Sequence, residues 1–373
     1  MPIMPAGAGL ELDMLKYSRL NLFAHGRPIA RRLAAWAAGL GLLIALPAQA
    51  GLGMTRIEAR DGRPPVVVYY PSPAPEQRQD YAPMHPSLAV DAELGPLNGR
   101  LIVISHGSGG SAWVHEQLAR RLTAAGFVAA MPEHDGDNQR DPWRPGPESW
   151  KKRPREVSQA IDAVAEDPRF GPLLQLDRVG GYGMSAGGHT MLSLAGGRWS
   201  PQRFLAHCQA HLLEDFPACV GVVLRQRGNW LDGIKAWLAR QVLEMRFDGD
   251  TQEQVHTDPR LAALVAAVPA AADFDMQSLQ HPRVPLALLT AAQDAWLKPR
   301  FHADQVLAHC LDCLHLGDLP KGGHGAYLAP LPDGLDGLLG ELLNDPAGFQ
   351  RSQTLEMDER VLQFFLRQLQ PLH

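Results

Sequence analysis

The stretch that most constrains the fold of this 373-residue chain is Gly-Tyr-Gly-Met-Ser-Ala-Gly-Gly-His, at residues 181–189. A short apolar run precedes it, and residues 186–195 follow with the spacing of a helix packed on a sheet. A serine at a sharp strand-to-helix turn needs strained backbone angles, and Gly183 and Gly187 flank Ser185 where small residues let the two elements pass. We interpret the stretch as a nucleophile elbow, although the pentapeptide alone also occurs in buried tight turns.

The start of the chain differs in character from the rest. Arginines precede an apolar run at residues 33–46, and Pro47 and the small-residue pattern Ala-Gln-Ala at residues 48–50 follow it. This order predicts a secretory signal peptide over residues 1–50, with a start at Met14 as an alternative. The run is short for a membrane span, so we expect a periplasmic or secreted protein with no stable span after cleavage.

Composition excludes some classes of function. The formal net charge is -5, with 45% hydrophobic and 20% charged residues, as in an ordinary globular chain. There is no long run of Lys and Arg, so we expect no nucleic-acid partner.

The four cysteines fall into two local pairs. Cys208 and Cys219 lie eleven residues apart, and Cys310 and Cys313 form a C-x-x-C. An even count in an oxidising compartment favours two disulfides. A redox or zinc role for the C-x-x-C lacks a second C-x-x-C motif.

Two β-rich runs open the mature chain. Residues 54–60 and 65–70 flank Asp61-Gly62, which predicts an antiparallel hairpin. Residues 71–99 carry many prolines and polar residues, and we expect a long surface loop there.

A buried parallel strand is predicted next, at the apolar run 101–105, with a glycine-rich turn at 106–110 directly after it. Such a turn can present the Ser108 N–H toward the elbow, where the Ala186 N–H would complete an oxyanion hole. The alternative is a simple turn without a ligand. A helix over 112–125 and a strand over 127–132 complete the unit.

Residues 133–153 are polar and are expected to form a solvated loop before a helix over 154–166. Its acidic residues and histidine do not form a metal loop, because no closing carboxylate is well placed. These residues are Glu133, His134, Asp135 and Asp137.

Residues 197–257 break the alternation of strands and helices and are expected to form a helical lid insertion. Residues 220–224 are the ambiguous part, since they would also suit a core strand. His207 and His211 lie four apart on a predicted helix, but no third ligand is spaced to join them in a metal site.

A serine needs a base, and the base needs a carboxylate that orients it. Asp294 follows one predicted strand, and His324 follows the last one. With Ser185 they give the order serine, acid, histidine, each beyond the end of a strand. Asp273 is the rival acid, whereas His315, His106 and His189 are expected to serve packing or hydrogen bonding. The later strands are predicted at residues 261–268, 284–290 and 314–319.

Four of these segments together resemble the α/β-hydrolase superfamily: the glycine loop at 105–110, the elbow at 183–188, Asp-Pro-Arg at 258–260 and Leu-Pro-Lys-Gly-Gly-His at 319–324. Within it they are similar to bacterial exported dienelactone-hydrolase-like proteins related to platelet-activating-factor acetylhydrolase. The resemblance implies a mostly parallel central sheet with helices on both faces. It also implies hydrolysis of short-chain acyl esters or phospholipid acetyl esters.

The chain departs from these relatives at two positions. Dienelactone hydrolases use cysteine where this chain has Ser185, which argues against lactone chemistry. The relatives often carry an apolar residue in place of Ser108.

We therefore expect an exported serine hydrolase of carboxylic esters, which forms an acyl-enzyme on a small-molecule ester or lipid and needs no cofactor or metal. The domain would span residues 51–373, with the lid at about 197–257. Two alternatives stay open. One is a non-catalytic binding protein of the same fold, and the other is an exported serine peptidase.

Overall fold

The computed structural model describes residues 51–81, 84–221, 224–332 and 334–369. All of them belong to one compact unit, Ala48–His373. The predicted signal peptide lies outside the described residues.

A ten-stranded sheet runs through this unit in the order β12-β11-β9-β7-β5-β6-β2-β1-β4-β3. Six neighbouring strands, from β6 to β12 in that order, pair in parallel, and β2 joins β6 antiparallel. The strands of this sheet are β1 (Gly51–Ile57), β2 (Val66–Ser72), β3 (Gln77–Arg78), β4 (Ser87–Val90), β5 (Leu101–Ser105), β6 (Val128–Pro132), β7 (Val179–Met184), β9 (Leu261–Ala267), β11 (Leu286–Ala291) and β12 (Leu314–Leu319). A separate pair of short strands joins β8 (Arg198–Trp199) to β10 (Phe274–Asp275).

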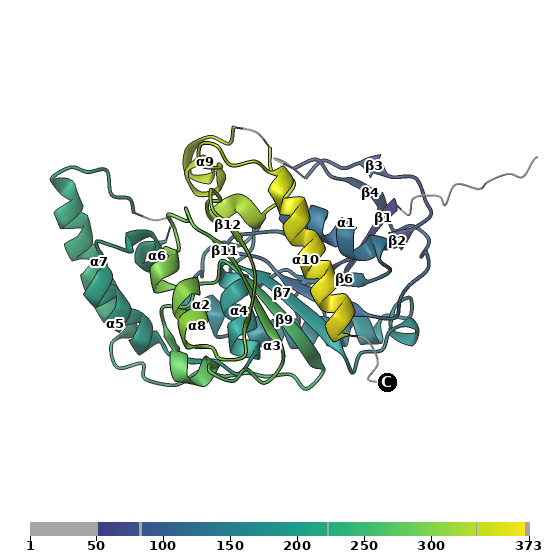
Figure 1. The fold of residues 1–373 in the computed structure, drawn as a ribbon, viewed down its shortest axis with the longest axis horizontal. Coiled ribbons are helices and arrows are strands. Elements are labelled where there is room, and N and C mark those ends of the chain that lie inside the picture. The colour runs from purple at the N-terminus through teal and green to yellow at the C-terminus, as the bar shows by residue number, and fades with distance from the viewer. Residues whose placement is uncertain (1–50, 82–83, 222–223, 333, 370–373) are drawn as a thin grey trace, which may run out of the picture. The chain divides into compact units, whose positions relative to one another are not determined.

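Helices connect the parallel strands. The α-helices are α1 (Glu116–Ala124), α2 (Pro147–Trp150), α3 (Arg153–Glu166), α4 (Ala186–Leu194), α5 (Pro201–His211), α6 (Phe216–Val220), α7 (Leu231–Phe247), α8 (Ala303–His309), α9 (Gly337–Leu343) and α10 (Ser352–Gln368). Short 3-10 turns are η1 (Ala112–His115), η2 (Gly171–Leu173), η3 (Met276–Leu279), η4 (Pro299–Phe301) and η5 (His324–Tyr327). Figure 1 shows α10, in yellow, beside α1, which it contacts.

The two faces of the sheet pack into two apolar cores, one on each side. Side chains of a strand alternate between faces, so Val103 packs in one core while its neighbours Ile102 and Ile104 pack in the other. The first core includes residues of α3 and α4, and the second includes residues of α1 and α10. Both faces are therefore covered, as a buried parallel sheet requires.

The predicted elements agree with the structure at the hairpin, the six parallel strands and the elbow. The expected hairpin is the antiparallel pair β1 and β2. The expectation of a plain loop over 71–99 was wrong in part, since β3 and β4 lie there and β4 pairs in parallel with β1. These strands are too short, at two and four residues, for periodicity to reveal them.

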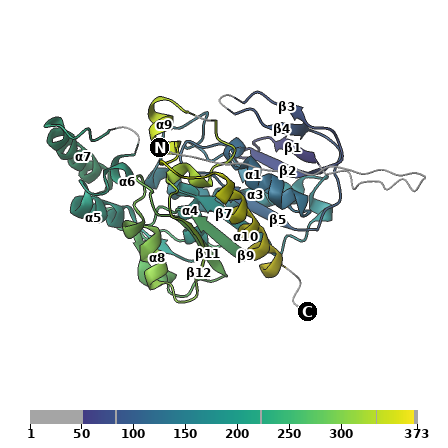
Figure 2. The same cartoon turned by 45° about the horizontal axis from the view of Figure 1, so that its top comes forward.

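The helical segment 197–257 contains α5, α6 and α7. Val220, where a core strand was the alternative, ends α6 instead. Figure 1 and Figure 2 both place α5 and α7 at the end of the unit opposite to β1–β4.

The cysteines form both expected disulfides, Cys208–Cys219 and Cys310–Cys313. The first ties α5 to α6. Within the described ranges, every helix falls short of the length and apolarity that a membrane crossing requires.

Candidate active site

The elbow places Ser185 between the end of β7 and the start of α4 with φ 60° and ψ -116°, in the region that strains a non-glycine residue. A Cβ on Gly183 would lie 2.0 Å from the Gly187 carbonyl oxygen. A Cβ on Gly187 would lie 1.9 Å from the carbonyl oxygen of Ser105. Both contacts are with backbone, so the two glycines are required by the close approach of strand, helix and β5.

The structure brings Ser185, His324 and Asp294 together. His324 Nε2 lies 3.0 Å from Ser185 Oγ, and its Nδ1 lies 2.8 Å from Asp294 Oδ2. The other oxygen, Asp294 Oδ1, accepts hydrogen bonds of 2.8 Å from the backbone N–H groups of Trp296 and Leu297. The carboxylate is thereby fixed from both sides, with one oxygen free for the imidazole.

The rival acid is engaged elsewhere. Asp273 Oδ2 lies 3.0 Å from Nε2 of His189, a residue of α4, and both side chains are buried. His189 therefore has a hydrogen-bonding role, as expected, and stacks on Trp150. His315 bonds Thr290 within the sheet.

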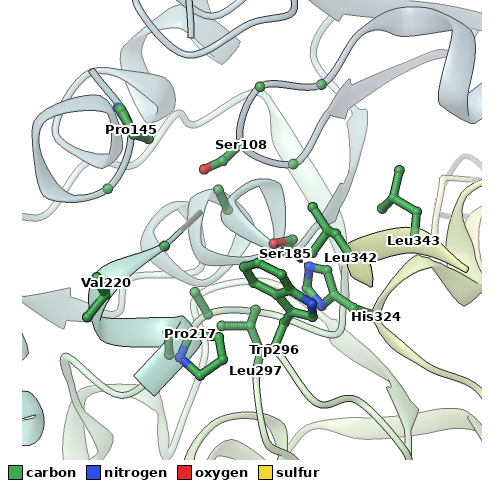
Figure 3. A pocket seen from close by; sticks show the side chains of 18 of the residues that line it. Ser108, Pro145, Ser185, Pro217, Val220, Trp296, Leu297, His324, Leu342 and Leu343 are labelled. Atoms are coloured by element: carbon green, nitrogen blue, oxygen red, sulfur yellow. Dashed lines mark hydrogen bonds between the residues drawn. The ribbon is translucent and has the colours of Figure 1, made fainter. Parts of the chain in front are cut away.

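The glycine loop lies against the elbow. A Cβ on Gly107 would be 3.4 Å from Ser185 Cβ. Among the described residues, neither the Ser108 N–H nor the Ala186 N–H finds a hydrogen-bond acceptor. Figure 3 shows Ser108, Ser185 and His324 around one space, with Ser185 and His324 pointing toward each other. The two N–H groups are available for an anionic oxygen there.

A buried ion pair braces this loop. Arg153 Nη2 donates to Asp137 Oδ2 at 2.8 Å, and both side chains are fully buried. Asp137 Oδ1 in turn accepts from the Gly109 N–H at 2.9 Å, and its Oδ2 accepts from Ser108 Oγ at 3.2 Å. Arg153 Nη1 also donates to the His106 carbonyl at 2.5 Å. Removal of either charge would leave the other buried without a counter-charge.

A second hydrogen-bonded group of serine, histidine and carboxylate adjoins the elbow at Ser105. Ser105 Oγ is 2.8 Å from His134 Nε2, and His134 Nδ1 is 2.6 Å from Glu156 Oε2. Burial raises the pKa of Glu156 from its ordinary 4.5 to about 7. Burial, helped by the nearby Arg153 charge, lowers the pKa of His134 well below its ordinary value.

The prediction of a solvated loop over 133–153 was therefore wrong for residues near its start. His134 and Asp137 are fully buried, and α2 lies within the segment. Their partners include Glu156 and Arg153 of α3, which lie 22 and 16 residues further along the chain. A local polar composition gives no sign of such long-range pairs.

Two histidines, His207 of α5 and His302 at the start of α8, contact one carboxylate. His207 Nε2 lies 2.9 Å and His302 Nε2 lies 3.0 Å from Asp215 Oδ2. Burial opposes the ionised form, but the hydrogen bonds from His207 and His302 outweigh it and lower the pKa of Asp215 to about 2. The Ala271 N–H donates to His302 Nδ1, so Nε2 carries the proton and cannot ligate a metal in this arrangement.

No group of three or more metal-ligating side chains is found in the part of the chain that the structure describes. The His207 and His211 rings pack against the Phe301 ring.

An apolar pocket of about 600 Å³ opens above the serine. Ser108, Ser185 and His324 line its floor, and Trp296 and Leu297 lie beside them (Figure 3). The remaining walls come mainly from apolar residues of α5, α6, α7 and α9, among them Phe204, Val220, Leu243, Leu342 and Leu343. A pocket of this volume with an apolar lining suits a ligand whose bulk is hydrocarbon.

Sequence reasoning missed Arg153, Asp137, His134 and Glu156 as neighbours of the site. The signal that existed was the placement of the polar run 133–137 directly after a buried strand, at the same sheet edge as the elbow. Nothing local identified α3 as the source of their partners.

This arrangement of sheet, elbow and strand-end side chains is an α/β-hydrolase fold. The chain is similar to the solved structure of a ferulic acid esterase from Streptomyces cinnamoneus, with a TM-score of 0.51 and 16% sequence identity. The match covers 87% of this chain and 91% of the other. At this identity the likeness establishes the fold. No protein-family model matches the chain, and the search of curated proteins found no match.

Proposed function

We propose that this protein is a serine esterase that cleaves carboxylic esters through an acyl-enzyme. The observation that carries the proposal is the hydrogen-bonded chain from Ser185 through His324 to Asp294 at the floor of an apolar pocket. The similarity in fold to a ferulic acid esterase agrees with this reaction class. The acyl group would be held by the apolar walls.

In the acylation step, Ser185 Oγ attacks the ester carbonyl carbon while His324 Nε2 takes the hydroxyl proton. Asp294 holds the His324 ring and stabilises its positive charge. The negative charge on the carbonyl oxygen is received by the N–H groups of Ser108 and Ala186. As the tetrahedral intermediate collapses, the bond to the alkoxy oxygen breaks, and the proton passes from His324 to the departing alcohol.

In the deacylation step, water takes the place of the alcohol. His324 removes a proton from the water as its oxygen attacks the acyl carbon, and the bond to Ser185 Oγ breaks. The proton returns to Ser185, and a carboxylic acid leaves. No metal or cofactor enters either step.

The proposal includes the setting of the enzyme. Residues 1–50 would direct export, and residues 51–373 would form the hydrolase domain with the α5–α7 segment as its lid. The two disulfides agree with a periplasmic or secreted location.

Hydrolysis of p-nitrophenyl acetate and butyrate tests the proposal. We expect turnover by the unaltered chain and a fall in kcat of at least about 10⁴-fold in Ser185→Ala, because the nucleophile is lost. Far-ultraviolet circular dichroism should be unchanged, since the variant removes one oxygen. Turnover retained by Ser185→Ala would overturn the proposal.

A further inference from the structure

Large apolar side chains surround the mouth of the pocket and are exposed to solvent. Trp143 is 82% exposed, and Leu238, Val242 and Leu339 are 47–49% exposed, yet all four line the pocket. They come from three separate segments, the 133–146 loop, α7 and α9. An apolar rim assembled from separate segments around one opening is a feature of interaction surfaces, whereas scattered single residues are not.

The rim continues along one side of α7. Residues three and four apart share a helix face, and Leu231, Ile234, Leu238, Val242 and Met245 follow that spacing. Met245 is 81% exposed and Ile234 is 49% exposed. Trp237, which is 59% exposed, flanks this stripe.

The opposite side of α7 is already used. Ala236, Ala239, Leu243 and Phe247 are buried, and α7 packs against α5, with Phe247 in edge contact with Phe204. Burial on one face accounts for the position of the helix but not for the apolar stripe on the other. Figure 1 shows α7 as the outermost element at its end of the unit, beside α5.

The charges on α7 favour a neutral occupant. Lys235 is paired with Asp232 on the same helix, and Arg246 is paired with Glu148 of α2. The stripe itself carries no charged residue, so it gains little from an anionic partner, whereas its exposed apolar side chains gain from any apolar phase.

The continuity of stripe and pocket decides between occupants. Leu238 and Val242 belong to both, so a protein partner or second copy seated on the stripe would cover the pocket mouth. A lipid surface covers the same face and can supply molecules to the opening. We infer that the apolar rim and the α7 stripe dock this protein on a neutral, zwitterionic lipid surface, which under the proposed function is the source of its ester.

Vesicle binding tests the inference without catalysis. The chain from residue 51, which holds every described element, carries Ser185→Ala so that vesicles stay intact. It is sedimented with unilamellar phosphatidylcholine vesicles. The test variant adds Ile234→Ser, Trp237→Ser and Met245→Ser, none of which lines the pocket. The matched control adds Leu173→Ser, Leu311→Ser and Leu355→Ser, which are exposed apolar residues away from the pocket.

We expect the background protein and the control to bind the vesicles, and the test variant to bind about 100-fold more weakly, because three inserted side chains are lost. Thermal unfolding should be equal in all three. Equal binding by test and control variants, or no binding by the background protein, would overturn the inference. A dimer without vesicles that the test variant abolishes would assign the surface to a second copy and would also overturn it.

The proposed function is separable in the same experiment. If the chain with Ser185 fails to hydrolyse p-nitrophenyl acetate while the background protein binds vesicles, the esterase proposal fails and the docking surface stands. If hydrolysis occurs and vesicles are not bound, the docking inference alone fails.

Discussion

Two chains of serine, histidine and carboxylate lie at the same edge of the sheet, and their distances hardly differ. One of these hydrogen-bonded chains opens to the pocket and is here named the open chain. In it, Ser185 and Asp294 lie 3.0 and 2.8 Å from the nitrogens of His324. The other is buried and is here named the sealed chain. In it, Ser105 and Glu156 lie 2.8 and 2.6 Å from the nitrogens of His134. The residue types and spacings alone would not tell a candidate nucleophile from a structural hydroxyl.

Access and backbone conformation separate the two chains. Ser185 lines the pocket at φ 60°, beside two N–H groups that find no acceptor in the described part of the chain. Ser105 lies inside strand β5 and is fully buried. The sealed chain instead supports the open one, because the Ser105 carbonyl oxygen is the atom against which Gly187 of the elbow packs. One hydrogen-bonded chain thus opens to the pocket, and the other holds the end of β5 in position.

Substitutions of His324 and His134 should give the largest difference in kcat between the two hydrogen-bonded chains. His324→Ala should lower kcat for p-nitrophenyl butyrate by at least about 10⁴-fold with little change in stability, because it removes the proposed base. His134→Gln should keep kcat within about tenfold while lowering the free energy of unfolding by about 1–3 kcal/mol, because buried partners lose their hydrogen bonds. Steady-state kinetics and urea unfolding measure both. Equal losses of kcat in the two variants would contradict the assignment of a catalytic role to His324 and a structural role to His134.

The two carboxylates that compete for the acid role give the next difference. Asp294→Asn should lower kcat by about 10³- to 10⁴-fold, because an amide no longer stabilises the charged His324 or selects its tautomer. Asp273→Asn should lower kcat by less than about tenfold, because Asp273 bonds His189. The reverse order of effects would move the acid to Asp273.

Loss of the Arg153–Asp137 ion pair, which holds the glycine loop, should have a smaller effect on kcat. Asp137→Asn weakens the hold on Gly109 and Ser108, so the N–H group of the proposed oxyanion hole is misplaced, and we expect kcat to fall about 10- to 100-fold. KM for p-nitrophenyl butyrate should stay within about threefold. His134→Gln serves as a variant destabilised by another route. If Asp137→Asn loses stability but keeps the kcat of that control, the ion pair has no part in positioning.

The sealed chain should also show in the pH dependence of stability. Burial raises the pKa of Glu156 from 4.5 to about 7, so the folded state holds a proton that the unfolded state has lost between these values. Its contribution to stability is full below about pH 4.5 and falls as the pH rises to about 7. Glu156→Gln should remove this fall, about 3 kcal/mol, in urea unfolding at pH 4.5 and pH 8. If Glu156→Gln changes the free energy of unfolding by the same amount at both pH values, the assignment is contradicted.

The sequence was informative where chemistry follows local pattern. The apolar runs of β5, β7, β9, β11 and β12 predicted the parallel sheet, and strand ends then placed Ser185, Asp294 and His324 at one edge. Gly183 and Gly187 predicted a close approach, which the contacts of their missing Cβ atoms confirm.

The remainder depended on contacts between distant segments. The pair of Arg153 and Asp137 joins a helix to a loop that by composition resembles a solvated turn, and His134 is satisfied by Ser105 of β5 and Glu156 of α3. The rim around the pocket likewise arises from three segments, none of which is unusual alone. Such features follow from tertiary packing, which hydrophobic periodicity does not encode.

Labelling with a fluorophosphonate probe tests the central claim most directly, because the probe bonds only to an activated and accessible serine. The chain is treated with the probe at neutral pH, digested, and the modified peptide is located by mass spectrometry. We predict a single modification on Ser185, lost in His324→Ala, and none on Ser105. An unlabelled Ser185 in the folded chain, or a label on Ser105, would contradict the account.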